Sequence, residues 1–210
     1  MTPTRAWWIL ALSPQIGCAL FLKSDPFVPR YFSPETATTS ASPIAPSGLE
    51  LRLGRVNAAD YLRDRIVFRD SAYEVGYYEE RRWTETPESY VRRELGRALF
   101  DRRGVRQIMY GAGSTLDVDV IAFEEVRGPA HVGRVELTYV VVGDRTVQFA
   151  HSITVERPIA NTTASAAADS IVQALGRALV DAVEIVAEGT CKELRVEAAT
   201  GLPSAAAATR

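Results

Sequence analysis

The alternation of apolar and polar residues predicts β-strands along most of the chain. In residues 49–53, three leucines alternate with Glu50 and Arg52, as in a strand with one buried face. The same period of two recurs in residues 72–79, 116–122, 135–141 and 147–155, and further strands are expected at 65–69 and 105–110. The last three long strands follow one another closely, which predicts an antiparallel meander.

Two other segments have the 3.6-residue apolar period of helices. The first is expected to begin at Thr86 as its cap, with Pro87 in the first helical position, and to end at Gly104. The second is expected over residues 164–187, ending at Gly189. Together these elements predict an α+β fold in which two helices pack on one face of an antiparallel sheet.

The N-terminus is organised like a secretory leader. Residues 1–17 place Arg5 before a short apolar stretch and a small residue before Cys18. Cys18 is therefore predicted to be acylated and to become the first mature residue. Ala19 at the next position is compatible with export to an outer membrane. Because Gln15 occupies the place of the usual leucine, an uncleaved anchor and a misplaced start codon stay open as alternatives.

Changes in composition divide the rest of the chain. Residues 18–48 are expected to form the lipid anchor and a linker, since residues 33–48 consist mostly of Ser, Thr, Pro and Ala. The folded domain is expected over residues 49–190. Residues 191–210 end in an Ala-rich stretch that predicts a disordered tail.

Charge and rare residues narrow the classes of function. The formal net charge is −2, which predicts no bulk attraction to nucleic acid. The chain has two cysteines and two histidines, too few and too far apart for a disulfide framework or a zinc site. We therefore expect no metal and no cofactor. The chain has no run of about 20 consecutive apolar residues, so its sequence predicts no ordinary transmembrane helix.

Several motifs have a chemical and a plainer structural interpretation, and the structural one is favoured for each. Gly111–Thr115 has the glycines of a phosphate loop, but a strand follows it instead of a helix. Asp117 and Asp119 share one strand face, as acid/base pairs can, yet an exposed face needs polar residues anyway. His151 is interpreted as a core or edge histidine rather than a pH-sensitive group.

The remaining motifs are treated in the same way. Three arginine pairs, at 81–82, 92–93 and 102–103, are interpreted as solvated surface, with headgroup or partner contact as the alternative. Asn161 matches a glycosylation acceptor and is interpreted as a helix cap. Cys191 is expected to be a free thiol, with an intermolecular disulfide as the alternative.

The order of these segments resembles the ABC-type transport auxiliary lipoprotein family, which includes the lipoprotein of the paraquat-inducible intermembrane transport system. The similarity covers about residues 31–190. It lies in Tyr31-Phe32, in LELRLGRV followed by Tyr61-Leu62 and RIVFRD, in RRWTETPESYVRRELGRALF, and in STLDVDVIAFEEV. The resemblance implies a non-catalytic lipoprotein on the periplasmic face of the outer membrane. Its partners would be MCE-domain or ABC-transporter subunits that move lipids or other hydrophobic molecules.

We therefore expect an interaction protein, in which Cys18 is the lipidation site and no residue is catalytic. Tyr61 and Trp83 are the residues expected to contact a partner, because they look more exposed than a solvated rim requires. A homo-oligomer is compatible with this function. One alternative is a lipid-binding module with a ligand between the sheet and the last helix, and another is an enzyme whose site forms only in three dimensions.

Overall fold

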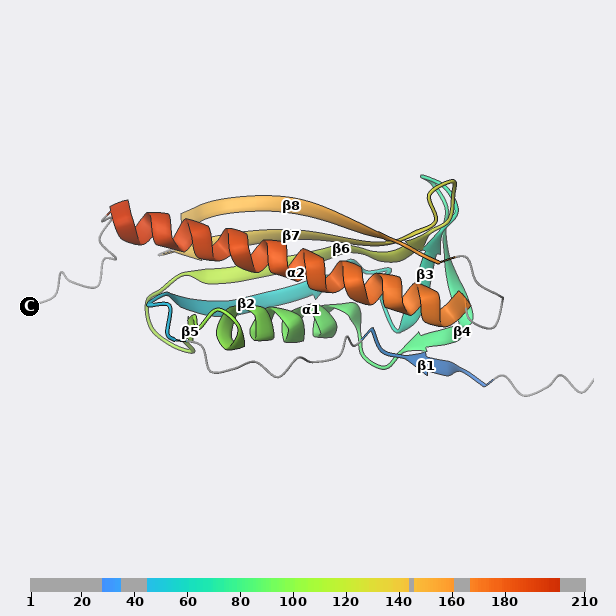
Figure 1. Ribbon diagram of the computed structural model, residues 1–210, viewed down its shortest axis with the longest axis horizontal. Helices are drawn as coiled ribbons and strands as arrows, with labels where there is room; N and C mark the ends of the chain where they lie inside the picture. The colour runs from blue at the N-terminus through green and yellow to red at the C-terminus, as the bar shows by residue number, and fades with distance from the viewer. Residues whose placement is uncertain (1–27, 35–44, 144–145, 161–166, 201–210) are drawn as a thin grey trace, which may run out of the picture.

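The computed structural model describes residues 28–34, 45–143, 146–160 and 167–200, and it confirms the α+β class (Figure 1). The strands are β1 (Arg30–Phe32), β2 (Glu50–Ala58), β3 (Arg65–Arg69), β4 (Val75–Trp83), β5 (Arg106–Gln107), β6 (Thr115–Val126), β7 (Val132–Gly143) and β8 (Thr146–Pro158). The helices are α1 (Pro87–Gly96), its π-helical continuation η1 (Arg97–Asp101), and α2 (Ala167–Thr200).

The sheet is mixed rather than antiparallel, which corrects the expected strand pairing. β6–β7–β8 form the antiparallel meander that the sequence predicted. On its other edge, however, β6 pairs in parallel with β2 and then with β3. Parallel neighbours need a long crossover connection, and the chain between β2 and β6 provides one, since it carries the β3–β4 hairpin and α1.

A bulge divides β6 into two halves whose side chains alternate differently. The pairing with β7 skips Ile121, so that Val120 lies opposite Leu137 and Ala122 opposite Glu136. An extra residue in one strand reverses which side chains face the core beyond that point. Phe123 therefore joins the core, although the parity of the first half would have turned it outward.

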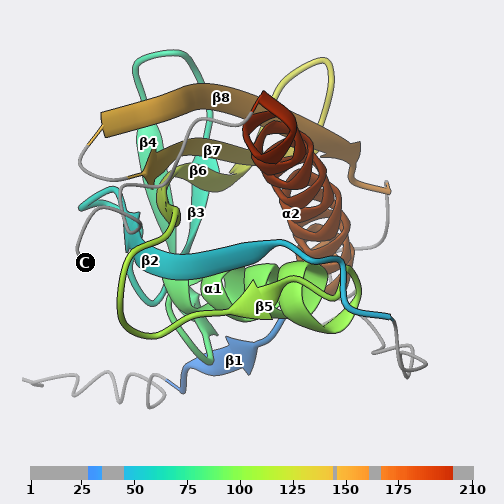
Figure 2. The same ribbon diagram turned by 90° about the vertical axis from the view of Figure 1, so that its left-hand side faces the viewer.

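Both helices cover the same face of the sheet and also contact each other (Figures 1 and 2). Thr86 has the extended backbone of an N-cap, but its hydroxyl pairs with Ser89 instead of a backbone N–H of the helix. Gly104, with φ 62°, follows the π turn in the left-handed conformation expected for a helix end. None of the described helices is long and apolar enough to cross a membrane.

Helix α2 extends further than its sequence indicated. It passes Gly189 and ends at Thr200, so the expected tail is helical up to that residue. A Cβ at Gly189 would lie 2.7 Å from the hydroxyl oxygen of Tyr139, so a larger residue there would displace the tyrosine side chain. The glycine therefore allows close packing of α2 on β7 instead of ending the helix. Residues 201–210 and Asn161, the expected cap, lie outside the described residues.

The predicted linker is also tied to the domain. β1 pairs in parallel with the end of β4, and a Cβ at Gly176 of α2 would meet the carbonyl oxygen of Pro34 at 2.6 Å. On the other side, the backbone N–H of Ser47 donates to Gly104 at 2.9 Å. The described residues on either side of 35–44 thus contact the rest of the fold, to which β1 adds a strand.

Candidate interaction site

A buried carboxylate forms the centre of the outer sheet face near the end of β6. Glu124 is fully buried, and its two oxygens accept hydrogen bonds from Nε and Nη2 of Arg69 at 2.8 and 3.2 Å. Arg134 of β7 donates to the same carboxylate from the other side. The β6 bulge turns Glu124 outward, where the neighbouring strands place the two arginines. Bidentate guanidinium contacts of this kind fix the side chains rigidly.

Tyr61 lies beside this ion-pair cluster. Its hydroxyl donates to the carbonyl oxygen of Ile121, at the bulge, over 2.8 Å. Burial raises the pKa of Tyr61, and the nearby carboxylate of Glu124 adds to the increase. Tyr61 also lines an open pocket of about 230 Å³ together with Tyr77, with Asp60, Arg63 and Asp64 of the β2–β3 connection, and with Arg65 at the start of β3.

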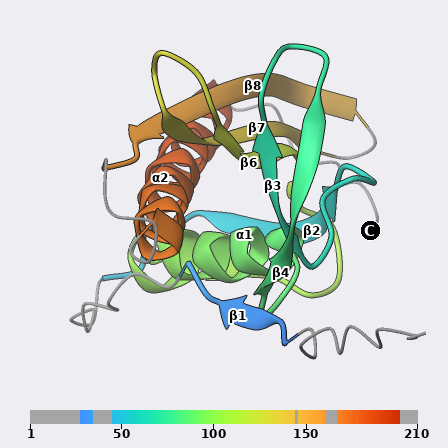
Figure 3. The ribbon, with the colours of Figure 1, turned by 90° about the vertical axis from the view of Figure 1, so that its right-hand side faces the viewer.

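A second polar cluster occupies the opposite face of the same strand. Glu125, 2% exposed, accepts hydrogen bonds from the hydroxyl of Tyr78 and contacts Nε2 of His131, both at 2.6 Å. Arg127 approaches Glu125 at 3.4 Å and stacks its guanidinium 3.6 Å from the ring centre of Phe68. Burial and the bond to Glu125 raise the pKa of Tyr78. The cluster joins the β3–β4 hairpin to the β6–β7 hairpin, whose turns lie toward the same side of the molecule in Figure 3.

The two residues expected to contact a partner have different environments. Tyr61 is half-buried and reaches the outer surface. Trp83 is only 2% exposed and packs edge-on against Tyr90 and Phe123, with ring centres 6.0 and 5.3 Å away. The expectation that Trp83 is exposed is therefore wrong, because its strand turns it into the core over α1. The partner-binding role expected for Trp83 loses its basis.

The other motifs from the sequence have structural roles. Asp117 accepts a hydrogen bond from the backbone N–H of Arg55 at 2.7 Å, and Asp119 accepts one from the Asn57 amide at 3.1 Å. His151 is exposed on the edge strand β8, within 6 Å of the rings of Tyr139 and Phe149. The loop from Gly111 leads directly into β6, without a helix.

Arginines of two of the three pairs, 92–93 and 102–103, form ion pairs that connect parts of the fold. Arg102 and Arg103 both bind the carboxylate of Glu184 on α2, the latter at 2.6 Å, and so clamp α2 to the end of η1. Arg93 pairs with Glu85 at 2.7 Å. Burial alone would raise the pKa of Glu184, but hydrogen bonds from Arg103 and Arg102 outweigh it and lower that pKa.

Sequence reasoning missed the Glu124 and Glu125 clusters and the Glu184 clamp. The visible indication was Glu124-Glu125 within a strand that otherwise alternates, preceded by Ile121 and Phe123 on the nominally polar face. Two adjacent carboxylates in a central strand require charged partners on both faces.

Cys191 is a buried free thiol, and burial raises its pKa. In the described part of the chain, no three His, Cys, Asp or Glu residues are placed to hold a metal.

Comparison with known protein families identifies the family of this chain. The model of the family described as the ABC-type transport auxiliary lipoprotein component matches residues 32–187. The chain belongs to this family. Its residues 32–187 span β1 to the middle of α2, which includes both carboxylate clusters and the Glu184 clamp.

Solved structures agree at the level of the fold. A Xanthomonas campestris protein of the family described as DUF330 superposes with a TM-score of 0.70 at 19% identity, covering 81% of this chain and 99% of its own. An uncharacterised protein superposes with a TM-score of 0.59 at 14% identity, covering 78% and 99%. No curated protein matches this sequence.

Proposed function

We propose that this lipoprotein is a non-catalytic accessory subunit of an ABC/MCE-type system that moves lipids or other hydrophobic molecules across the cell envelope. Acylated Cys18 would hold it at the periplasmic face of the outer membrane. The single observation that carries the proposal is the family match over residues 32–187. An ABC-type auxiliary component acts by contact with transport subunits, and the MCE-domain protein is the partner we propose.

The domain would stay close to its membrane. Because β1 begins at Arg30, only the twelve Cα steps from Cys18 connect the lipid to the sheet. Fully extended, that distance is at most about 40 Å. This short connection favours a partner that approaches the outer membrane closely.

The surface around Tyr61 is the proposed docking site. Tyr61 and Tyr77 offer aromatic rings beside the rigid Glu124 cluster, and Tyr73 on the hairpin tip is 99% exposed. Aromatic side chains surrounded by charges are typical of protein interfaces, where rigid anchors lose little entropy on binding. Tyr61 lies in the β2–β3 connection, Tyr73 in the β3–β4 turn and Tyr77 in β4, and Tyr61 and Tyr77 line one pocket that a partner can contact.

Site-specific photo-crosslinking tests this proposal in the intact envelope. A benzoyl-phenylalanine at position 77 should crosslink to an MCE-domain or ABC-transporter subunit. The matched control is position 110, where the native tyrosine is 90% exposed in the β5–β6 connection, at the end of the molecule away from the β3–β4 hairpin (Figure 1). Crosslinking at position 110 and not at position 77 would place the docking site at the end of the molecule near residue 110 and not around Tyr61. No transport subunit at either position would contradict the proposed function.

Intact mass tests the anchor separately. We expect a mature chain that starts at Cys18 and carries added acyl mass, and loss of that mass in a Cys18→Ser variant. An unmodified chain starting at Met1 would remove the proposed anchor.

A further inference from the structure

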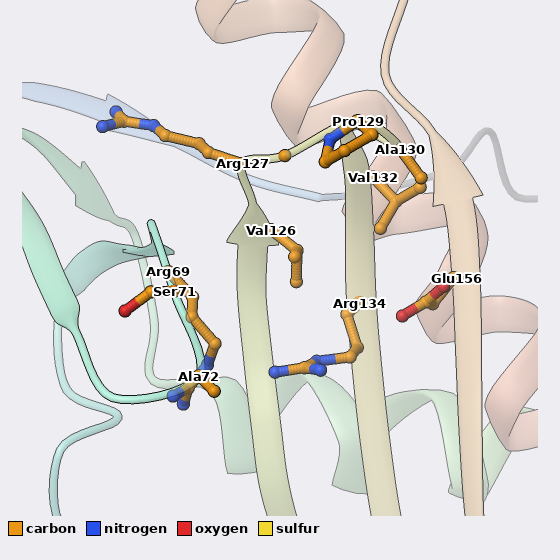
Figure 4. A pocket seen from close by; sticks show the side chains of 11 residues that line it. Arg69, Ser71, Ala72, Val126, Arg127, Pro129, Ala130, Val132, Arg134 and Glu156 are labelled. Carbon is orange, nitrogen blue, oxygen red and sulfur yellow. The ribbon is translucent and has the colours of Figure 1, made fainter.

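A second, larger pocket opens on the outer sheet face between the tips of the two hairpins (Figure 4). Its volume is about 340 Å³, and its apolar wall is formed by Val126, Val132 and Pro129. Arg69 and Arg134 reach toward each other across β6, and Glu156 points in from β8. The pocket thus combines an apolar wall with separated positive and negative groups.

The positive side of the pocket retains hydrogen-bonding capacity. Each guanidinium has five N–H groups, and Glu124 accepts only three of the ten that Arg69 and Arg134 provide. The side chains of Arg69 and Arg134 are 20% and 23% exposed, so a ligand in the pocket can reach part of each. One carboxylate between two guanidiniums leaves a net charge of +1. A phosphate or carboxylate group of a ligand would neutralise this positive charge and accept hydrogen bonds from the two guanidiniums.

The negative side is a single exposed carboxylate. Glu156 pairs with Arg134 in the strand register, yet among the described residues no cation approaches its carboxylate within an ion-pair distance of 4 Å. Arg127 does not fill this role, because Figure 4 shows its side chain directed away from the pocket, consistent with its stacking on Phe68. An ammonium group of a ligand is the natural partner for Glu156.

We infer that this pocket binds a zwitterion that carries an anionic phosphate and a primary ammonium, the chemistry of phosphoethanolamine. The phosphate would contact Arg69 and Arg134, and the ammonium Glu156. The apolar wall favours the form of this group that bears a hydrophobic tail, as in phosphatidylethanolamine. The turns of the β3–β4 and β6–β7 hairpins, whose residues line the pocket, and strand β1 lie toward the same end of the long axis (Figure 1). The inference rests on these charges and not on the docking site around Tyr61.

Titration of the full chain in non-ionic detergent tests the inference. The probes are dihexanoyl-phosphatidylethanolamine, dihexanoyl-phosphatidylglycerol, which lacks the ammonium, and soluble O-phosphoethanolamine, each followed by isothermal calorimetry. We expect phosphatidylethanolamine to bind about tenfold more tightly than phosphatidylglycerol, which corresponds to ~1.4 kcal/mol. Equal binding of O-phosphoethanolamine would identify the headgroup alone as the ligand and support the same chemistry.

Glu156→Gln is the decisive variant, because an exposed carboxylate outside the Glu124 cluster can be neutralised without unfolding the chain. It should abolish the preference for the ethanolamine lipid and leave phosphatidylglycerol binding unchanged. The control is Glu136→Gln. Glu136 lies in β7, on the same face of the sheet as Glu156, but it does not line the pocket. Equal affinity for both lipids, or a preference that persists in Glu156→Gln, would overturn the inference. Neither result depends on whether position 77 crosslinks to a partner.

Discussion

Two regions of the molecule use the same arrangement, one carboxylate held between two arginines, in different surroundings. Glu124 is fully buried between Arg69 and Arg134, whose side chains are 20% and 23% exposed. Glu184 is 37% exposed, and it clamps α2 to Arg102 and Arg103. A buried carboxylate that loses its partners cannot be rehydrated, whereas an exposed one can. The same contacts should therefore differ several-fold in their effect on stability.

The largest expected effect is that of Glu124→Gln. The variant leaves two guanidiniums facing each other without the carboxylate, and it should lower the free energy of unfolding by about 3 kcal/mol or more. For a chain of this size, that lowers Tm by roughly 6–12 °C. Thermal and urea unfolding of the variant measure the loss. Glu136→Gln, on the same sheet face, should change stability by less than about 0.5 kcal/mol. Similar losses in both variants would show that burial does not set the difference.

The sequence contained much of the fold but not this cluster. Alternation predicted the meander, and Pro87 and Gly104 bounded the first helix, since both are local properties of the chain. The parallel pairing of β2 with β6 depends on contacts between residues some 60 positions apart, which no local pattern reports. The outward turn of Glu124 depends on the bulge at Ile121, and a one-residue shift reverses every later side chain.

The candidate site was predicted in part for the same reason. Tyr61 follows β2 in a connection, where an aromatic residue has no strand to bury it, and it does reach the surface. Trp83 looked similar in sequence, but the end of β4 lies against α1, and α1 supplies Tyr90 as its neighbour. The helix end predicted at Gly189 was wrong for a different reason: this glycine lies inside α2, where the missing Cβ leaves room for the hydroxyl of Tyr139.

A pair of double-mutant cycles compares the two regions directly. Replacing Arg69 and Glu124 singly and together should give a coupling free energy on the order of 2 kcal/mol, because both groups lie in a low-dielectric environment. The same cycle for Arg102 and Glu184 should give less than about 1 kcal/mol. Both cycles use urea unfolding under one buffer condition. Added salt should weaken only the second coupling strongly, and equal salt dependence would contradict the difference in burial.

Acid should reveal the smaller contribution of Glu184. Its pKa is lowered in the folded chain, so its stabilising effect is present above the ordinary glutamate pKa of about 4.3 and disappears as pH falls through the lowered value. Glu184→Gln should therefore be less stable than the native chain near pH 7 and equally stable at strongly acidic pH. Unfolding of both chains across that range measures the convergence. A constant gap at every pH would mean that the amide loses packing and not charge.

The last variant, Tyr61→Phe, tests how Tyr61 is held. The variant removes the 2.8 Å hydrogen bond to the carbonyl of Ile121, which should cost about 0.5–1.5 kcal/mol at neutral pH. Because the pKa of Tyr61 is raised in the folded chain, this contribution is complete below the ordinary tyrosine pKa of about 10 and is lost as pH rises through the raised value. The stabilities of the two chains should therefore approach each other in alkali.

Since the phenol of Tyr61 anchors the bulge that turns Glu124 outward, the Tyr61→Phe variant should also reduce crosslinking from position 77. Unchanged crosslinking would separate the docking surface from the ion-pair cluster beneath it.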